Sequence, residues 1–179
     1  MKIIVLQGGE DIKRRTNREL LEANVKISRR KSIAVIPWTT DDPEKERYYR
    51  GVIADYFREL GAKEIYFIER RHEKEEIRMI LDKTDILYLP GGDPKILYST
   101  IKEKRIEELI KNFNGIIIGN SAGAIVLSKG EVSNEINPGL GIVDFYVKVH
   151  FTPNEKPISL NKDSVVCIPE NQWIIVLKK

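Results

Sequence analysis

The chain has 179 residues, of which 41% are hydrophobic and 32% are charged, and this balance is typical of one folded soluble domain with a sizeable core. The net charge of +3 is small and acidic and basic residues are interspersed, which argues against a nucleic-acid or membrane partner. The single cysteine, Cys167, excludes an internal disulfide and favours a reducing compartment. No apolar run reaches membrane-spanning length and the start MKIIVLQGG lacks a signal-peptide pattern, so we expect a cytoplasmic protein.

Short apolar runs alternate with amphipathic segments along most of the chain, which predicts an α/β fold with a mostly parallel sheet. We expect strands at residues 2–7, 32–37, 64–69, 85–90 and 115–120. Helices are expected at residues 16–28, 41–61, 73–81 and 94–113. The strand at 115–120 is almost wholly apolar, as expected for a central strand covered on both faces.

The segment from Asp41 to Gly61 carries the clearest helix signals. Asp42 is a suitable N-cap, Pro43 suits the first turn, and Gly61 ends the periodic pattern. The residues that recur at helical spacing on its apolar face are Tyr49, Val52, Ile53, Tyr56, Phe57 and Leu60.

The pattern changes after Ser128. Residues 142–151 alternate like an exposed strand, and residues 164–169 and 173–178 are expected as closing strands. Because no repeat, low-complexity segment or linker divides the chain, we expect residues 1–179 to form a single domain.

The sequence Gly119-Asn120-Ser121-Ala122-Gly123 matches the pattern G-x-S-x-G at the end of a buried strand. In a nucleophile elbow, a serine on a tight strand-to-helix turn projects its hydroxyl outward, and flanking glycines avoid collisions in the turn. The free N–H groups of the following helix can face an oxyanion that forms beside the serine. The alternative interpretation is a turn whose serine only caps a helix.

A serine nucleophile needs a base, and the chain has two histidines. His72 lies in the charged sequence ERRHEKEE and is interpreted as a surface residue. His150 lies at the end of a strand, where sites in α/β sheets assemble, and is the candidate base.

The third member of such a triad is a carboxylate that orients the imidazole. The acidic candidates after Ser121 are Glu131, Glu135, Asp144, Glu155, Asp163 and Glu170. Spacing alone does not choose among them.

A glycine loop, Pro90-Gly91-Gly92-Asp93, follows the fourth expected strand. Gly91 or Gly92 can supply a backbone N–H to an oxyanion hole together with the N–H of Ala122, although such a sequence is also an ordinary turn. Gly8-Gly9 after the first strand is a weaker candidate for the same rim. No metal or cofactor site is predicted, since the histidines and the cysteine lie far apart in the sequence.

These residues resemble peptidase family S51, which includes aspartyl dipeptidase (peptidase E) and cyanophycinase. The resemblance rests on the elbow GNSAGA, the loop PGGDP and the sequence VHF around His150, and it covers residues 1–151. It implies a three-layer α/β sandwich of the class I glutamine amidotransferase-like, flavodoxin-like type. The implied activity is a cytoplasmic serine hydrolase of small peptides, with Ser121 as nucleophile and His150 as base.

The resemblance also assigns further site residues. Glu135 matches the acid of peptidase E, and the oxyanion hole would come from Gly91 or Gly92 and Ala122. Where the family pattern has three glycines followed by Asn-Thr, Asp93 alters the rim of the substrate site. No arginine follows Arg105, which argues against specificity for an N-terminal aspartate.

The leading hypothesis is therefore a serine peptidase of the dipeptidase kind that needs no cofactor. A cyanophycinase-like or esterase activity is the alternative within hydrolases, and a catalytically silent ligand-binding domain is the alternative outside them. A glutamine amidotransferase is disfavoured because serine replaces the expected cysteine. A homodimer is a further hypothesis, with Trp38 and Trp173 as candidates for either an interface or a core position.

Overall fold

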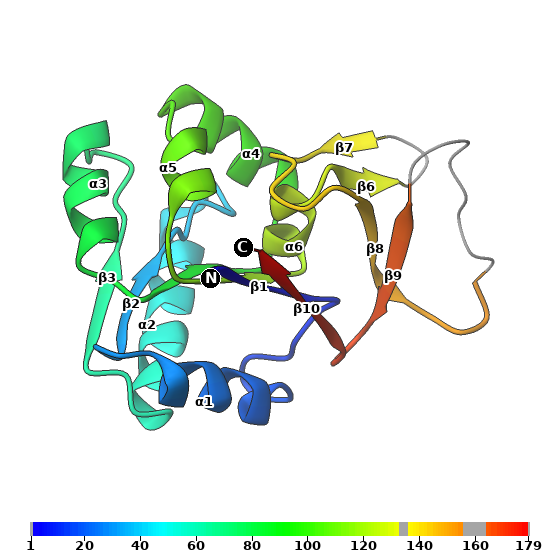
Figure 1. Cartoon of the computed structure of the whole chain (residues 1–179), viewed down its shortest axis with the longest axis horizontal. Helices are drawn as coiled ribbons and strands as arrows, with labels where there is room; N and C mark the ends of the chain where they lie inside the picture. Colours follow the sequence, from blue (N-terminus) through cyan, green and yellow to red (C-terminus); the bar gives the residue numbers. More distant parts are fainter. Residues whose placement is uncertain (1, 133–135, 156–163, 179) are drawn as a thin grey trace.

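A six-stranded β-sheet forms the centre of the structure, a computed structural model that describes residues 2–132, 136–155 and 164–178 (Figure 1). Its strands are β1 (Lys2–Gln7), β2 (Ser32–Val35), β3 (Glu64–Phe67), β4 (Ile86–Leu89), β5 (Ile116–Asn120) and β10 (Trp173–Lys178). They lie in the order β10-β1-β5-β4-β2-β3, and every pair is parallel except β1 with β10. The mostly parallel sheet predicted from the sequence is confirmed.

Helices cover both faces of this sheet. The first face packs against α1 (Arg18–Ile27) and α2 (Pro43–Glu59), and the second against α3 (Lys74–Asp82), α4 (Pro94–Glu103), α5 (Glu107–Asn112) and α6 (Ala122–Leu127). Successive strand residues point to opposite faces, so Val5 and Ile118 join the first core while Ile4 and Ile117 join the second. The result is the three-layer sandwich that the family resemblance implied.

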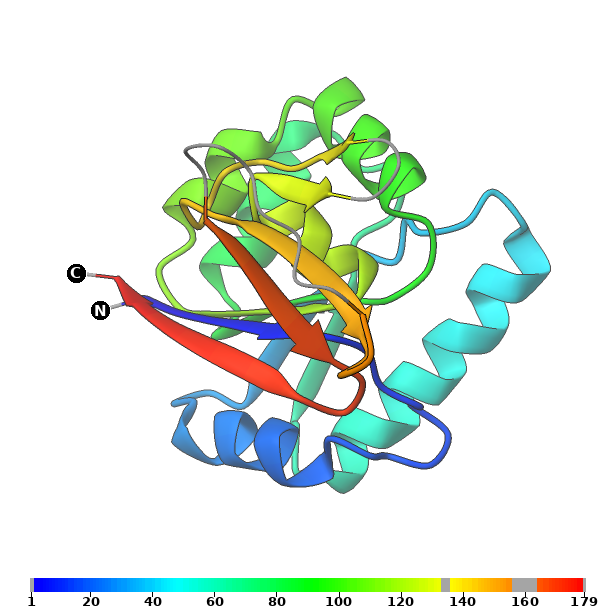
Figure 2. The same cartoon turned by 90° about the vertical axis from the view of Figure 1, so that its right-hand side faces the viewer.

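A second, smaller sheet, which the sequence analysis did not predict, stands beside the first. It consists of β6 (Gly130–Val132), β7 (Ile136–Pro138), β8 (Tyr146–Phe151) and β9 (Val165–Pro169), in the order β7-β6-β8-β9. Its residues Val147, Val149 and Ile168 belong to the same hydrophobic cluster as α3 to α6. Figure 2 shows that β9 turns directly into β10, so that the chain passes from the small sheet back to the edge of the large one.

The helix signals in residues 41–61 are confirmed at both ends of α2. The Asp42 carboxylate accepts hydrogen bonds from the backbone N–H groups of Glu44 (2.9 Å) and Lys45 (3.1 Å). Pro43 is the first helical residue, and Gly61 lies beyond the end at φ +91°. Tyr49 differs from the expectation, since it is 38% exposed rather than part of the core.

One further expectation needs correction, and the structure also places Trp38 and Cys167. The helical region 94–113 is divided into α4 and α5 around Arg105, which has a positive φ of 54°. Trp38 has no exposed surface and donates its indole N–H to the carbonyl of Ile68 (2.8 Å), so it is a core residue. Cys167 lies on β9 and is only half-buried.

In the part of the chain that the structure describes, no helix is both long and apolar enough to span a bilayer.

Candidate active site

Ser121 lies between β5 and α6 in a strained backbone conformation. Its φ of +47° and ψ of −103° are rare for a residue with a side chain. Its N–H donates to the carbonyl of Gln7 on the neighbouring strand (3.0 Å), and its carbonyl accepts from Ile125 in α6 (3.0 Å). These two bonds hold the turn so that the hydroxyl faces out of the carboxyl end of the sheet.

The glycines of the elbow are required by close packing. A Cβ atom on Gly119 would lie 2.6 Å from the backbone of Gly123, and one on Gly123 would lie 2.1 Å from the carbonyl oxygen of Leu89 in β4. Small residues at both positions therefore let α6 begin directly against β5 and β4.

His150 is the partner of the Ser121 hydroxyl. Its Nε2 atom lies 2.7 Å from Ser121 Oγ. His150 itself has a positive φ of 52°, at an irregularity in the pairing of β8 with β9, and its N–H donates to the carbonyl of Gly8 (2.8 Å). The irregularity turns the imidazole away from the small sheet and toward the end of β5.

Glu170 is the carboxylate on the other side of the imidazole. It lies just after β9, and its Oε2 atom forms a hydrogen bond with His150 Nδ1. Ser121, His150 and Glu170 thus form one continuous hydrogen-bonded chain. Glu135, which the resemblance assigned to this position, lies outside the described residues.

The end of β1 supports this arrangement through two glycines. Gly8 donates to the carbonyl of Gln172 (3.0 Å), and the N–H of Asn171 donates to the carbonyl of Gly9 (3.1 Å). Gly9 has a φ of +155°, and a Cβ atom there would lie 2.3 Å from Glu170 Oε2 and 2.5 Å from His150 Cε1. The Gly8-Gly9 pair is therefore in direct contact with His150 and Glu170.

The predicted loop after β4 lies on the opposite side of Ser121. A Cβ atom on Gly91 would be 3.6 Å from Ser121 Cβ, whereas Gly92 (φ +136°) lies against Thr39. Ala122 is the first residue of α6, directly after Ser121. Asp93 is not among the residues that line the cavity at Ser121; its carboxylate caps α4 by accepting from Lys95 N–H (2.7 Å) and Ile96 N–H (3.2 Å).

Ser121 and His150 line a cavity of about 550 Å³. Its walls come from the Gly91 loop, the segment after β1, the loop after β2 and residues 45–53 of α2. The acidic side chains that line it are Glu10, Asp11 and Glu46, and the basic ones are Lys13, Lys45 and Arg50. The volume suits a small ligand, and the mixed charges suit one that carries both signs.

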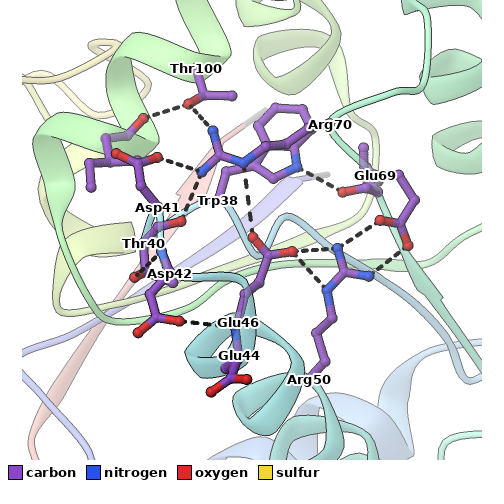
Figure 3. A network of polar contacts seen from close by, with 12 residues as sticks. Trp38, Thr40, Asp41, Asp42, Glu44, Glu46, Arg50, Glu69, Arg70 and Thr100 are labelled. Atoms are coloured by element: carbon purple, nitrogen blue, oxygen red, sulfur yellow. Dashed lines mark hydrogen bonds and ion pairs between the residues drawn. The ribbon is translucent and has the colours of Figure 1, made fainter.

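An ion-pair network fixes the α2 wall of this cavity (Figure 3). Arg50 donates to Glu46 (2.6 and 2.9 Å) and, through two nitrogens, to Glu69 beyond β3 (2.6 and 2.9 Å). Arg70 donates to the carbonyl of Thr40 (2.9 Å) in the loop after β2. The Arg50 guanidinium is thus already paired, although it lines the cavity.

Other candidates from the sequence lie elsewhere. Asp144 is exposed and pairs with Lys129 (2.9 Å), which lowers the pKa of the aspartate. The Nδ1 atom of His72 accepts a hydrogen bond from the backbone N–H of Glu69 (3.1 Å), remote from Ser121 in the sheet order. Among the described residues, no group of three or more His, Cys, Asp or Glu side chains is arranged to hold a metal ion.

Glu10 and Asn120 were not expected from the sequence, and Glu170 was one of six acidic candidates. Glu170 and Glu10 each lie within three residues of the end of an expected strand. Because sites of α/β proteins assemble at strand ends, this position is the sequence signal that favours both residues as site candidates. Asn120 occupies the first variable position of the G-x-S-x-G pattern, and the pattern itself assigns no role to that position.

The model of peptidase family S51 matches residues 3–178, almost the whole chain.

Solved structures with the same fold include a peptidase from an acI-B1 Actinobacterium (TM-score 0.68, 18% identity, 98% of this chain and 83% of that one). A second is a protein of Listeria monocytogenes provisionally described as a peptidase E (TM-score 0.72, 18% identity, 98% of this chain and 94% of that one). At this identity the two structures establish the fold alone.

Curated relatives match a shorter stretch. The pyridoxal 5'-phosphate synthase subunit PdxT of Oceanobacillus iheyensis is 29% identical over 90 residues, 45% of each chain. The same subunit of Methanocaldococcus jannaschii is 34% identical over 79 residues, 43% of this chain and 41% of that one. The chain thus spans less than half the length of the curated relatives it matches.

Proposed function

On the premise that this chain belongs to peptidase family S51, and is thus a peptidase, we propose that it is a serine hydrolase that cleaves small peptides through an acyl-enzyme at Ser121. The observation that carries the proposal is the hydrogen-bonded chain from Ser121 Oγ through His150 to Glu170. A serine, a base and a carboxylate in this order are the parts that nucleophilic acyl transfer requires.

The reaction then proceeds in two halves. His150 Nε2 takes the Ser121 proton while Oγ attacks the scissile carbonyl carbon, and the C–N bond breaks as His150 gives that proton to the leaving amine. In the second half His150 takes a proton from water, the hydroxide attacks the acyl-enzyme, and Ser121 recovers its proton. Glu170 holds Nδ1–H and stabilises the imidazolium in both halves.

The oxyanion is assigned to backbone donors on both sides of Ser121. Gly91 approaches the Ser121 side chain from β4, and Ala122 follows it in the chain. Removing one oxyanion donor typically costs about 3 kcal/mol of transition-state stabilisation, so these two N–H groups are major contributors.

The substrate class is a dipeptide or similarly small peptide. The cavity of about 550 Å³ accommodates a ligand of this size, and its three acidic and three basic side chains complement a zwitterion. A cytoplasmic location is part of the same proposal, since the one cysteine is a free thiol.

The test is hydrolysis of Asp-Leu, Ala-Leu, Glu-Leu and Lys-Leu by wild type and variants. We expect Ser121→Ala to abolish cleavage while the fold is retained, and Glu170→Gln to lower kcat by about 10³- to 10⁴-fold. Glu135→Gln separates the two acid assignments, because it leaves kcat near wild type if Glu170 orients the histidine. Cleavage that survives in Ser121→Ala, or a wild type that no fluorophosphonate labels at Ser121, would contradict the proposal.

A further inference from the structure

Glu10 is a carboxylate in the cavity wall that pairs with no cationic side chain of the described residues. Its Oε1 atom accepts hydrogen bonds from the Tyr56 hydroxyl (2.8 Å) and from the Asn17 backbone N–H (3.1 Å). Its Oε2 atom is buried and has no hydrogen-bond partner. Within the described residues no basic side chain forms an ion pair with Glu10, and the nearest ionised neighbour in the sequence is Asp11.

The position of Glu10 is costly for a charged group. Burial raises the pKa of Glu10; the hydrogen bonds from Tyr56 and Asn17 oppose this, and the Asp11 charge adds to it. A buried carboxylate without a counter-ion loses hydration that its surroundings do not replace. Such a group beside a reactive serine is a candidate for a ligand contact.

Neighbouring side chains add further unused acceptors. Asn120 is 2% exposed and Gln7 has no exposed surface, and the two pair across β1 and β5. Both have a buried amide oxygen without a partner, and so does Asn17. The unpartnered atoms of this group are four oxygens and the single Nε2 nitrogen of Gln7. Of these side chains, Glu10 and Asn120 line the cavity, so a ligand there meets acceptor oxygens and is favoured by N–H donors, as an ammonium group with three of them is.

The location ties this acceptor group to the reaction. Glu10 follows Gly9, the glycine in contact with His150 and Glu170. Glu10, Asn120 and Ser121 line the same cavity. In an N-terminal residue the amino nitrogen is only two bonds from the carbonyl carbon that a nucleophile attacks.

We propose that Glu10, assisted by the amide oxygen of Asn120, binds the free α-amino group of the residue whose carbonyl Ser121 attacks. This inference rests on the proposed function and makes Glu10 its specificity-determining residue. The substrates are then peptides with an unblocked amino terminus, cleaved after their first residue. Because Glu10 Oε2 has almost no exposed surface, this contact requires a small shift of the glutamate side chain toward the cavity, where the ammonium group sheds its water. An analogue without that group leaves the acceptors unpaired, which produces strong discrimination.

The experiment compares a dipeptide with an analogue that lacks only the amino group. Ala-Leu is paired with propionyl-Leu, and Asp-Leu with succinyl-Leu, so that neither analogue adds bulk. For wild type we expect kcat/KM to favour the amino form by at least about 10³-fold. Glu10→Gln keeps an acceptor for Tyr56 but removes the charge, and we expect it to lower this ratio by about 100-fold, mostly through KM.

Two controls keep the result interpretable. Glu44→Gln changes an exposed carboxylate on α2 outside the cavity and should leave the ratio at its wild-type value. Glu10→Asp keeps the charge and should restore part of the ratio. Fluorophosphonate labelling of Ser121 is measured in every variant, so that loss of the serine chemistry is distinguished from loss of amine selection.

The outcomes separate the two proposals. A lower ratio with Ser121 still labelled supports the assignment of Glu10. If Glu10→Gln leaves the ratio of the two kcat/KM values unchanged, or lowers kcat/KM equally for the dipeptide and its analogue, the assignment of Glu10 is overturned. The proposal of a serine hydrolase then still stands. Absence of Ser121 labelling in wild type overturns the proposed function and this inference with it.

Discussion

Two of the three residues in the hydrogen-bonded chain have backbone angles that residues with side chains rarely adopt. Ser121 has φ +47° and His150 has φ +52°. Each such conformation costs on the order of 1–3 kcal/mol and persists only where surrounding contacts fix it. The contacts that fix them are the hydrogen bonds of Ser121 with Gln7 and of His150 with Gly8. The end of β1 therefore holds both side chains, although it supplies neither.

Gly9 provides a test of this support. In Gly9→Ala the new Cβ would collide with the side chains of His150 and Glu170, which are free to move, rather than with backbone. The clash is relieved by displacing the side chains that the reaction needs, so activity is lost more than stability. We expect kcat/KM to fall by at least about 100-fold, while the urea unfolding free energy falls by only about 1–2 kcal/mol.

Gly51→Ala is the matched control. Gly51 lies inside α2, and its new Cβ would meet no atom within 4 Å. Alanine there should raise the unfolding free energy by about 0.5–1 kcal/mol and leave kcat/KM unchanged. If Gly9→Ala kept wild-type labelling of Ser121 by a fluorophosphonate, the supporting role of Gly9 would be refuted.

At the scale of elements, α2 is attached to the end of β3 through a half-buried ion pair. Arg50 on α2 is 20% exposed, forms two hydrogen bonds with Glu69, and lies 5.2 Å from the centre of the Phe67 ring. The hydrogen bonds from Arg50 lower the pKa of Glu69. Because this wall of the cavity is formed by the same helix, the pair positions the substrate site as well as the helix.

The pH dependence of this attachment follows from that shift. A carboxylate whose folded-state pKa is below its unfolded value stabilises the fold at neutral pH, and the contribution disappears as the pH falls through the folded-state pKa. We expect Arg50→Met to lower the unfolding free energy by about 1 kcal/mol at pH 7, and by less near pH 3, where glutamates of the unfolded chain are mostly protonated. Urea titrations at both pH values measure this.

Arg58→Met is the control on the same helix. Arg58 pairs with Asp55 (3.1 Å), but both side chains are about two-thirds exposed. Exposed pairs contribute little, so its effect should stay below about 0.5 kcal/mol at either pH. A loss for Arg50→Met that is equal at pH 7 and pH 3 would contradict the role given to Glu69.

Local signals predicted the elements well because they act over a few residues. The cap at Asp42 and the glycines of the elbow are recognisable in the sequence and are found in the structure. The proposed acid was not predictable in this way. Glu170 reaches His150 only because the turn between β9 and β10 docks against Gly8 and Gly9, a contact between chain segments about 160 residues apart. The residue-by-residue resemblance pointed to Glu135 instead, and nothing in local periodicity could decide between the two.

At the scale of the whole molecule, the site lies where the two sheets meet. Ser121 directly follows β5 of the large sheet, His150 lies on β8 of the small one, and Glu170 lies in the connection between β9 and β10. β10 closes this arrangement by pairing with β1 along its full length, from Lys2 with Lys178 to Gln7 with Trp173 (Figure 2). The position of Glu170 therefore depends on how firmly β10 is attached, even though β10 lines no part of the cavity.

Two alanine substitutions separate this coupling from stability in general. Ile174 on β10 pairs with Leu6 and packs partly against the core, so Ile174→Ala should cost about 1–2 kcal/mol. Ile77 is fully buried in the same core but lies on α3, at the end of the large sheet away from β10 (Figure 1), and Ile77→Ala should cost more, about 3 kcal/mol. Because Ile174 is four residues from Glu170, we expect the less destabilising change to reduce kcat by about tenfold and the more destabilising one to leave kcat unchanged. The measurement is kcat at 25 °C beside the urea unfolding free energy of each variant. If kcat instead fell in the same order as stability, the attachment of β10 would have no special link to the site.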